Sequence, residues 1–367
     1  MSAAPASADP VRVGLIGYGY AGRVFHAPLI AASDGIELIA VASSRPEAVR
    51  ESFAGVAVEP TPAGLIARDD IDLIVIASPN DSHAPLARAA LQAGKHVVVD
   101  KPFALSLDEA RSVCAAAERA GRLLAVFHNR RWDSDFLSVR AAIERGDAGQ
   151  VAHFESHFDR FRPEVRDRWR ERAGGGGGIW YDLGPHLIDQ ALQLFGLPDV
   201  VEASLAALRP GANADDWAHA VLHYPDRRVI LHASMLAAGG SARFIAHGTD
   251  GSLVKQRGDQ QEAQLLAGMV PGAAGWGEDN DPLRLYRADD CRTLPLVAGD
   301  QRTFYCGVAH AISGTGPNPV PPIEALAVMA VIEAGLSASA DRCATPLDLT
   351  PAERAMFAVG RRASGQT

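Results

Sequence analysis

Cysteine is scarce in this sequence. Its four cysteines are widely spaced, form no C-x-x-C pair and have no histidine partners at the spacing of metal ligands; they are Cys114, Cys291, Cys306 and Cys343. Neither a zinc site nor a disulfide framework is therefore expected. A few isolated cysteines fit a reducing compartment, so the sequence predicts a cytoplasmic protein that holds no metal.

The sequence also has fewer basic than acidic residues, and it lacks long apolar runs. The 35 Lys and Arg residues are outnumbered by 44 Asp and Glu residues, which gives a formal net charge of -9. Such a chain has no overall basic field to attract nucleic acid or anionic lipid. Charged residues interrupt the apolar runs before about 18 residues, and residues 2–10 contain no basic segment. We therefore expect no nucleic-acid partner, no membrane span and no signal peptide.

The sequence is long enough for two domains. Its 367 residues are 47% hydrophobic and 22% charged, a globular balance, and a domain typically takes about 100 to 200 residues. In residues 1–130, continuously apolar runs alternate with alanine-rich helical patterns, as in βαβ units around a parallel sheet. Strands are expected at 11–16, 36–41, 72–77, 96–99 and 123–127, and helices at 22–32, 84–93 and 107–120. This half is predicted to be an α/β Rossmann domain with a doubly wound sheet.

Residues 131–367 have a different pattern. A helical stretch at 135–145 precedes longer β-rich runs joined by hairpin-like turns, which predicts an α+β domain with an open, largely antiparallel sheet. The expected strands are 151–158, 200–208, 219–223, 228–235, 243–246 and 252–255, followed by a loop at 268–281. Helical patterns at 302–312 and 323–337 close the chain and can pack back on the first domain.

A glycine motif follows the first predicted strand. Gly17, Gly19 and Gly22 form a complete G-x-G-x-x-G between a strand and a helix, with Tyr20 inside it. The first glycine permits a tight turn, the second lets backbone amides approach a pyrophosphate, and the third lets the helix pack on the sheet. Phosphates are then bound at the helix N-terminus. The motif in this βαβ context predicts a dinucleotide cofactor, and a glycine turn without a ligand is the alternative.

The residues after the second predicted strand bear on the identity of this cofactor. Ser43, Ser44 and Arg45 stand where an NAD enzyme usually has an acidic residue for the ribose hydroxyls. A carboxylate there repels a 2′-phosphate, whereas two hydroxyls and a guanidinium bind it by charge-assisted hydrogen bonds. The sequence therefore favours NADP, and NAD is the alternative if Arg45 is only a solvated loop residue.

Polar residues follow the runs at 72–77 and 96–99, at the sheet edge where open α/β proteins bind ligands. Ser78, Asn80 and His83 come after the first run, and Lys101 comes after the second. A lysine held near a nicotinamide loses solvation and can take part in proton transfer. The alternative is that Lys101 is an ordinary loop lysine before a proline.

The third cluster follows the glycine run at 174–178. Asp182 and His186 are four residues apart and would share one face of a helix, as would His186 and Asp189. An imidazole beside carboxylates in a cleft is a credible general acid or base. Because Pro185 fits only the first turn of a helix, we expect the helix to start near residues 182–184, which makes Asp182 its possible N-cap.

Four motifs in this order resemble one family. They are G-x-G-x-x-G after the first strand, S-P-N-x-x-H, D-K-P, and D-x-G-x-H-x-x-D after a glycine run. Together they are similar to the glucose-fructose oxidoreductase and inositol dehydrogenase (Gfo/Idh/MocA) family, and the likeness extends to the closing helices. Residues 127–133 and 155–163 resemble a subgroup that includes bacterial NADP-dependent scyllo-inositol dehydrogenases.

The resemblance implies roles by position. Lys101, Asp182 and His186 would be the catalytic residues: Asp182 would contact substrate, and His186 would do acid/base work, although Lys101 and His186 could exchange roles. Asp100 departs from the family's usual glutamate, and we expect its shorter side chain to shift Lys101 slightly. The implied cofactor contacts are Gly17, Gly19, Tyr20, Gly22, Ser43, Ser44, Arg45, Ser78, Asn80, His83, Lys101 and Asn129. The candidate substrate contacts are Arg130, Trp132, His157, Trp169 and Asp182.

The resemblance also implies an activity. The expected function is NADP-dependent interconversion of a secondary alcohol and a ketone on a cyclic polyol or sugar, with scyllo-inositol as the first candidate. One alternative is a reductase of another aldose, ketose or imine, and another is a regulator that senses NADP without turnover. The open sheet of the second domain commonly forms oligomer contacts in this family, which implies a homodimer or homotetramer.

Overall fold

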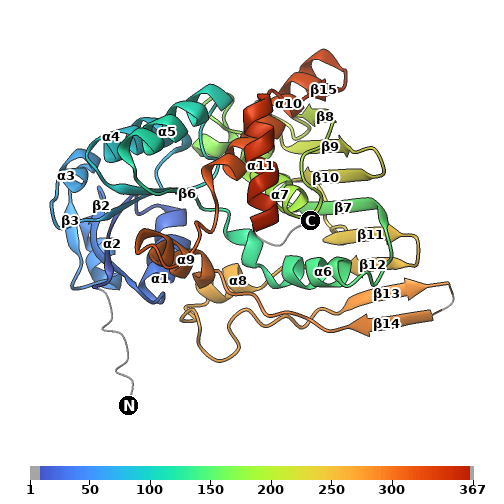
Figure 1. The fold of residues 1–367 in the computed structure, drawn as a ribbon, viewed down its shortest axis with the longest axis horizontal. Coiled ribbons are helices and arrows are strands. Elements are labelled where there is room, and N and C mark those ends of the chain that lie inside the picture. The colour runs from blue at the N-terminus through green and yellow to red at the C-terminus, as the bar shows by residue number, and fades with distance from the viewer. Residues whose placement is uncertain (1–8, 289, 364–367) are drawn as a thin grey trace.

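The computed structural model of the chain describes residues 9–288 and 290–363. These residues form two β-sheets with helices packed around them, and the sheets lie side by side along the long axis of the molecule (Figure 1). Both the parallel sheet and the second, largely antiparallel sheet confirm the predicted fold class. The predicted boundary at residue 130 stays a prediction.

In the described part of the chain the first sheet has six strands, all paired in parallel in the order β3-β2-β1-β4-β5-β6. This is the doubly wound order, which reverses between β1 and β4. The central strands consist of Val, Leu and Ile buried on both faces, as expected for strands covered by helices. The strands are β1 Val11–Ile16, β2 Ile36–Ala42, β3 Ala57–Glu59, β4 Leu73–Ile76, β5 His96–Val99 and β6 Leu124–Val126.

The helices of this half agree with the sequence expectation where they are long. Ser106 caps α5 by accepting from the Glu109 amide at 3.1 Å, as the capping box predicts. The short elements α2, β3 and α3 were not expected, because three to seven residues carry too little periodicity. The helices are η1 Gly22–His26, α1 Ala27–Ala31, α2 Pro46–Ser52, α3 Pro62–Ile66, η2 Asn80–Ser82, α4 His83–Gln92 and α5 Leu107–Ala120.

The second sheet has nine strands among the residues described, in the order β14-β13-β12-β11-β7-β10-β9-β8-β15. All neighbours are antiparallel except β7 and β10. Strands β13 to β15 were not expected from the sequence. The strands are β7 Val151–Asp159, β8 Val200–Ala206, β9 Trp217–His223, β10 Arg228–Ser234, β11 Phe244–Gly248, β12 Ser252–Lys255, β13 Leu283–Arg287, β14 Asp290–Leu294 and β15 Thr345–Pro346.

Helices α7 and α10 pack against each other and against this sheet, and they form the core of the second half together with it (Figure 1). α10 is apolar and long enough to cross a membrane by length and composition, but 67% of that window is buried inside the protein, as in a core helix. α9 contacts α1 and β2 of the first half. The helices are η3 Asn129–Trp132, α6 Ser134–Glu144, η4 Trp169–Glu171, α7 Ile179–Phe195, α8 Gln261–Leu266, α9 Arg302–Ile312, α10 Pro322–Asp341 and α11 Pro351–Ala363.

The expected start of α7 was wrong. The helix begins at Ile179, so Asp182 lies within its first turn and Pro185 lies inside the helix. The cap comes from a distant residue: the Asp215 carboxylate accepts from the Trp180 amide at 2.7 Å, and its carbonyl accepts from Ile179 at 2.8 Å. A partner 35 residues away leaves no local signal in the sequence.

Candidate active site

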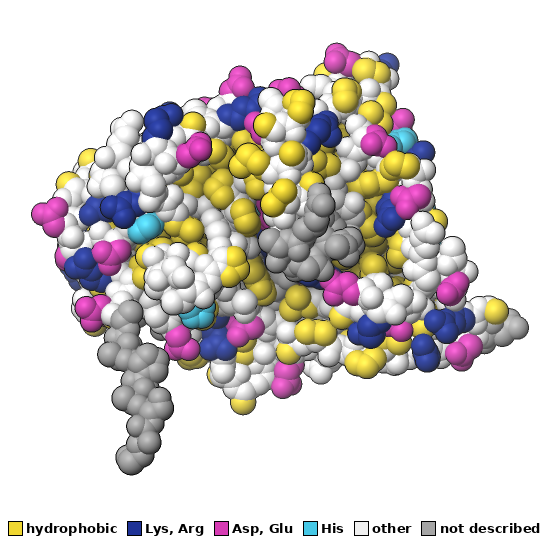
Figure 2. All heavy atoms as spheres, in the orientation of Figure 1, with side chains coloured by type: hydrophobic (Ala, Val, Ile, Leu, Met, Phe, Trp, Pro, Cys, Tyr) yellow, Lys and Arg dark blue, Asp and Glu magenta, His cyan; other side chains and the backbone are white. Residues whose placement is uncertain are grey.

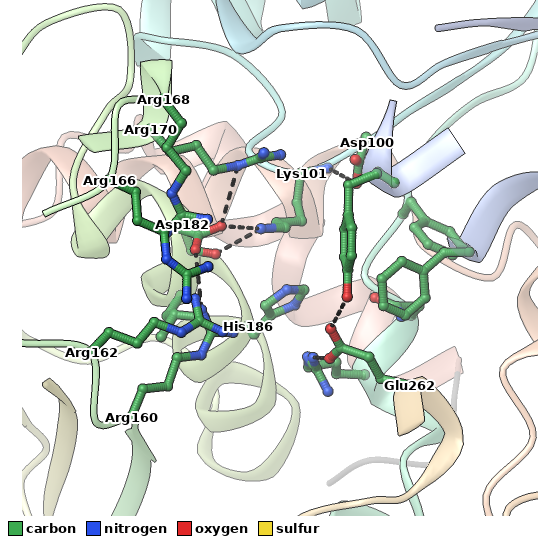
Figure 3. Close-up of a pocket in the computed structure, with 17 residues that line it drawn as sticks. Asp100, Lys101, Arg160, Arg162, Arg166, Arg168, Arg170, Asp182, His186 and Glu262 are labelled. Atoms are coloured by element: carbon green, nitrogen blue, oxygen red, sulfur yellow. Dashed lines mark hydrogen bonds and ion pairs between the residues drawn. The ribbon is translucent and has the colours of Figure 1, made fainter. Parts of the chain in front are cut away.

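A cavity of about 380 Å³ lies between the two halves, within the usual range for small-molecule sites (Figure 3). The glycine loop and the ends of the parallel strands form one wall, and α7 with the segment before it forms the other. Its lining residues are Tyr20, Ala21, Phe25, Asp100, Lys101, Phe127, Asn129, Arg130, Arg160, Arg162, Arg166, Arg168, Arg170, Asp182, Leu183, His186 and Glu262.

The glycine loop has the shape that a dinucleotide requires. Gly17 has φ +97°, and a Cβ there would lie 2.6 Å from the carbonyl oxygen of Ala77. A Cβ on Gly22 would lie 2.1 Å from the carbonyl oxygen of Gly17. At Gly19, by contrast, a Cβ would meet no described atom within 4 Å. The open space over Gly19 fits a pyrophosphate approaching the backbone amides.

Ser43, Ser44 and Arg45 lie beside this loop, at the end of β2. The Arg45 guanidinium donates to the carbonyl oxygen of Tyr18 at 2.8 Å, and its amide donates to Ser43 Oγ at 3.0 Å. Ser44 and Arg45 are exposed. The Arg45 guanidinium therefore lies against the glycine loop, and the preference of these three residues for a 2′-phosphate stays a prediction.

The loop after β4 joins the glycine loop to the second half. Asn80 is buried and donates to the carbonyl oxygen of Gly176 at 3.1 Å. Both ring nitrogens of His83 face carbonyl oxygens, those of Pro102 at 2.8 Å and Ser78 at 3.0 Å. In this structure Asn80 and His83 hold backbone segments in place, and their predicted contact with a cofactor is not tested.

Lys101 and Asp182 form the centre of the cavity. Lys101 Nζ donates to the backbone oxygen of Asp182 at 2.7 Å and to Oδ1 at 3.1 Å. Arg160 and Arg170 lie 3.6 Å and 3.7 Å from the same carboxylate. Burial alone would raise the pKa of Asp182, but the charges of Lys101, Arg160 and Arg170 bring it well below its usual range. Asp182 is therefore an anion that holds Lys101 in place.

His186 lies one turn further along α7. The residue is 6% exposed, and its Nδ1 has no hydrogen-bond partner among the residues described. Burial and the positive charges of Lys101 and Arg130 lower the pKa of His186 well below the ordinary value. The imidazole is therefore neutral near pH 7 and able to accept a proton. Asp189, expected on the same helix face, instead pairs with Arg131 at 2.9 Å.

Packing on the far side fixes the orientation of α7. Trp180 Nε1 donates to the carbonyl oxygen of Ile332 on α10 at 3.0 Å. A Cβ on Gly335 would lie 2.7 Å from the Trp180 ring, and one on Gly184 would lie 3.1 Å from it. The indole therefore packs between α7 and α10, against a glycine of each helix. This contact sets the position of Asp182 and His186.

A hydrogen-bonded chain begins at Tyr20 of the glycine loop. Tyr20 OH donates to Glu262 at 2.9 Å, and Arg130 donates to Glu262 at 2.8 Å and to Asp133 at 3.0 Å. Burial and the Glu262 carboxylate raise the pKa of Tyr20 to about 12, so the phenol stays protonated. Asn129, which also lines the cavity, donates to Gln301 at 3.0 Å.

Three predicted substrate contacts lie outside the cavity lining. Trp132 packs edge-on against Phe304. His157 lies on β7 and bonds Glu155 at 2.8 Å. Trp169 lies under the guanidinium of Arg170, 4.4 Å from its ring centre. Their role in substrate binding stays a prediction.

Sequence reasoning missed two features. Buried His26 lies 3.7 Å from Asp100 and shares a 2.5 Å contact with the hydroxyl of Tyr305, and no local motif marks this trio. Burial would raise the pKa of Asp100, but His26, Lys101 and His83 lower it to about 2. The second feature is the group of arginines at 160–170. Their close spacing in the sequence could have indicated a cationic site.

Comparison with known proteins agrees with this geometry. Residues 11–128 match the NAD-binding Rossmann fold of an oxidoreductase family (Gfo/Idh/MocA), and residues 140–347 match its C-terminal alpha/beta domain. The chain is 52% identical over 338 residues to the uncharacterized oxidoreductase YdgJ of Escherichia coli, covering 91% of this chain and 98% of that protein. It is 36% identical over 340 residues to the NADP-dependent scyllo-inositol 2-dehydrogenase IolW of Bacillus subtilis, covering 91% and 95%.

A solved structure shows the same fold. The crystal structure of a candidate oxidoreductase from Klebsiella pneumoniae superposes with a TM-score of 0.91 at 54% identity, covering 96% of this chain and 99% of that one. The family matches span both sheets and the cavity between them. The chain therefore belongs to the Gfo/Idh/MocA family of oxidoreductases and is an enzyme with a Rossmann NAD(P)-binding domain.

Proposed function

We propose that this enzyme is an NADP-dependent dehydrogenase that interconverts a secondary alcohol and a ketone on a polyhydroxylated ring. The observation that carries the proposal is the meeting of Lys101, Asp182 and His186 in one cavity that opens onto the glycine loop. The printed activity of IolW supports scyllo-inositol as the first substrate to test, and Ser43, Ser44 and Arg45 support NADP over NAD.

The protein's part in this reaction is orientation and proton transfer. A bound nicotinamide supplies the redox chemistry by accepting a hydride from the carbinol carbon. Neutral His186 takes the hydroxyl proton, and Lys101 donates a hydrogen bond to the same oxygen while it gains alkoxide character. Asp182 orients Lys101 and accepts from a neighbouring hydroxyl of the ring. The products are the ketone, the reduced nicotinamide and one proton, which leaves from His186.

The test is the appearance of reduced-nicotinamide absorbance with scyllo-inositol, myo-inositol and common aldoses, each with NADP and with NAD. Lys101→Met and His186→Asn should each lower kcat by at least about 100-fold, far more than they weaken NADP binding. His310→Asn is the matched control, because His310 is exposed on α9 outside the cavity. Near-normal turnover in both site variants, or tight NADP binding without turnover on any substrate, would contradict the proposal.

Two finer expectations accompany it. A cytoplasmic location and assembly as a homodimer or homotetramer remain predictions from the sequence.

A further inference from the structure

One side of the cavity is built from arginines. Five of them occur within eleven residues and all line the cavity: Arg160, Arg162, Arg166, Arg168 and Arg170, here called the arginine segment. In Figure 3 their side chains converge on the region of Asp182 and His186. With Lys101 and Arg130 they make seven cationic side chains around the cavity, against three carboxylates among the described residues.

Some of these charges are balanced by the protein. Arg168 pairs with Glu171 at 2.7 Å. Arg160 and Arg170 share the carboxylate of Asp182, which also holds Lys101. One carboxylate among three cations leaves positive charge in excess at the centre of the site.

The other two arginines have no acidic partner. Within residues 9–288 and 290–363, neither the Arg162 nor the Arg166 guanidinium forms a salt bridge. Partial burial, together with the charges of Arg160, Arg166 and Arg168, lowers the pKa of Arg162. Two guanidinium groups beside other cations are therefore free to bind a ligand.

The backbone that carries them is firmly held. Buried Arg209 donates to the carbonyl oxygens of Arg162 at 3.0 Å and Glu164 at 3.1 Å. Arg209 is itself paired with Asp216 at 2.9 Å and with Glu171 at 3.1 Å. Glu171 also accepts from the Arg166 amide at 2.9 Å. A buried ion-pair network thus positions a like-charged segment before any ligand arrives, which lowers the ordering cost of binding.

This positive site stands out from the rest of the molecule. The protein has a net charge of -9, and on the face shown in Figure 2 basic and acidic side chains alternate over the surface. A cationic cavity in an acidic protein draws small anions toward itself selectively. The planar guanidinium group binds two oxygens of a phosphate or carboxylate with paired hydrogen bonds.

We propose, building on the proposed dehydrogenase function, that the natural substrate is an anionic sugar or cyclitol whose phosphate or carboxylate group is bound by Arg162 and Arg166. The alcohol to be oxidised then lies beside Lys101 and His186. The phosphates of the cofactor are not the ligand of this segment. In Figure 3 the arginine side chains gather around Asp182 at the left, whereas Glu262, which bonds Tyr20 of the glycine loop, lies at the right, beyond His186.

The kinetic test compares matched neutral and anionic substrates with NADP: D-glucose with D-glucose 6-phosphate and with D-glucuronate, and myo-inositol with myo-inositol 1-phosphate. The wild type should prefer at least one anionic member by about 10-fold or more in kcat/KM, and the phosphate and carboxylate arms show which group is used. The double variant R162Q/R166Q should lower that preference by about 10-fold or more, the value of one charge-assisted hydrogen bond. Arg172→Gln is the control, since Arg172 pairs with Asp167 outside the cavity.

The second readout needs no turnover. Inorganic phosphate is titrated calorimetrically into the protein saturated with NADP, which fills the glycine loop; R162Q/R166Q should lose this binding and R172Q should keep it. Equal or better use of the neutral substrates by the wild type, or an unchanged preference in R162Q/R166Q, would overturn the inference while leaving the dehydrogenase proposal standing. If no substrate is turned over, phosphate binding that the double variant loses supports the anion site, and absent or unaltered binding refutes it. Thermal unfolding of each variant confirms that it is folded.

Discussion

Replacing Asp182 by asparagine should expose the repulsion that its carboxylate suppresses. The substitution keeps the side-chain shape but leaves Lys101, Arg160 and Arg170 facing one another without an anion. At the 3.1 Å separation of Lys101 Nζ and Asp182 Oδ1, the Coulomb attraction in an effective dielectric of about 20 is about 5 kcal/mol before desolvation is subtracted. Removing one partner of a buried pair typically costs about 3–5 kcal/mol.

The partial exposure of this pair reduces that cost. The two side chains are 14% and 17% exposed, so we expect D182N to lower the free energy of unfolding by about 2–4 kcal/mol. Adding Lys101→Met removes one of the repelling cations. The double variant should then be more stable than the sum of the two single effects predicts, by about 1–3 kcal/mol.

Urea unfolding of the wild type, the two single variants and the double variant measures this coupling. The pKa of Asp182 is lowered, so its carboxylate is charged at every pH above the ordinary value of 3.8, and its stabilisation is lost only as the pH falls below that value. The D182N penalty should therefore be constant from pH 5 to pH 8. Additive single effects, or a penalty that changes within this range, would refute the electrostatic account of the site.

Three further predictions concern the cofactor loop and the buried charges. Gly19→Ala should fold normally, since its Cβ meets no described atom within 4 Å, yet weaken NADP binding by about 10-fold or more in a fluorescence titration. Burial lowers the pKa of His128 from 6.5 to about 4, so the unfolded chain takes up a proton before the folded chain as the pH falls. Between pH 7.5 and 4.5 the wild type should therefore lose about 2.5 kcal/mol of stability that His128→Leu does not lose, measured by urea unfolding. Arg131→Met should lower the free energy of unfolding by about 3–5 kcal/mol because it leaves Asp189 and Glu324 buried without their shared cation; a loss under 1 kcal/mol would contradict this.

The fold was predictable wherever the chain repeats a pattern over many residues. The apolar runs predicted the strands of the parallel sheet, because strands buried on both faces are continuously apolar. The capping box at Ser106 predicted the start of α5, because the cap is local in the sequence. β13 and β14 were missed because their sequences, such as Leu283–Arg287, carry charged residues on an exposed edge of the sheet. The start of α7 was misplaced because Asp215, a residue from another loop, supplies its cap.

The candidate site shows the same division. The resemblance to the family implied that Lys101, Asp182 and His186 belong to one site, and the three side chains do line one cavity. The sequence did not predict the ion pair between Asp189 and Arg131. The two residues are far apart in the chain, and only the packing of α7 brings them together. The sequence also did not predict that His26 lies near Asp100, because these two residues come together only in the folded core.

The cavity wall that α7 and the arginine segment form together has two parts, and these parts are anchored differently. α7 carries Asp182 and His186 and is locked to α10 by the Trp180 indole, so a change in its tilt must disturb the core of the whole second half. Arg162 and Arg166 reach the same cavity from the part of the loop whose carbonyl oxygens at residues 162 and 164 are held by Arg209. With the proposed anion site, substitutions at Arg162 and Arg166 should therefore change substrate preference while Arg160 and Arg170 stay beside Asp182. Directed evolution toward a new ring substituent should accumulate its changes in that loop and leave α7 unchanged.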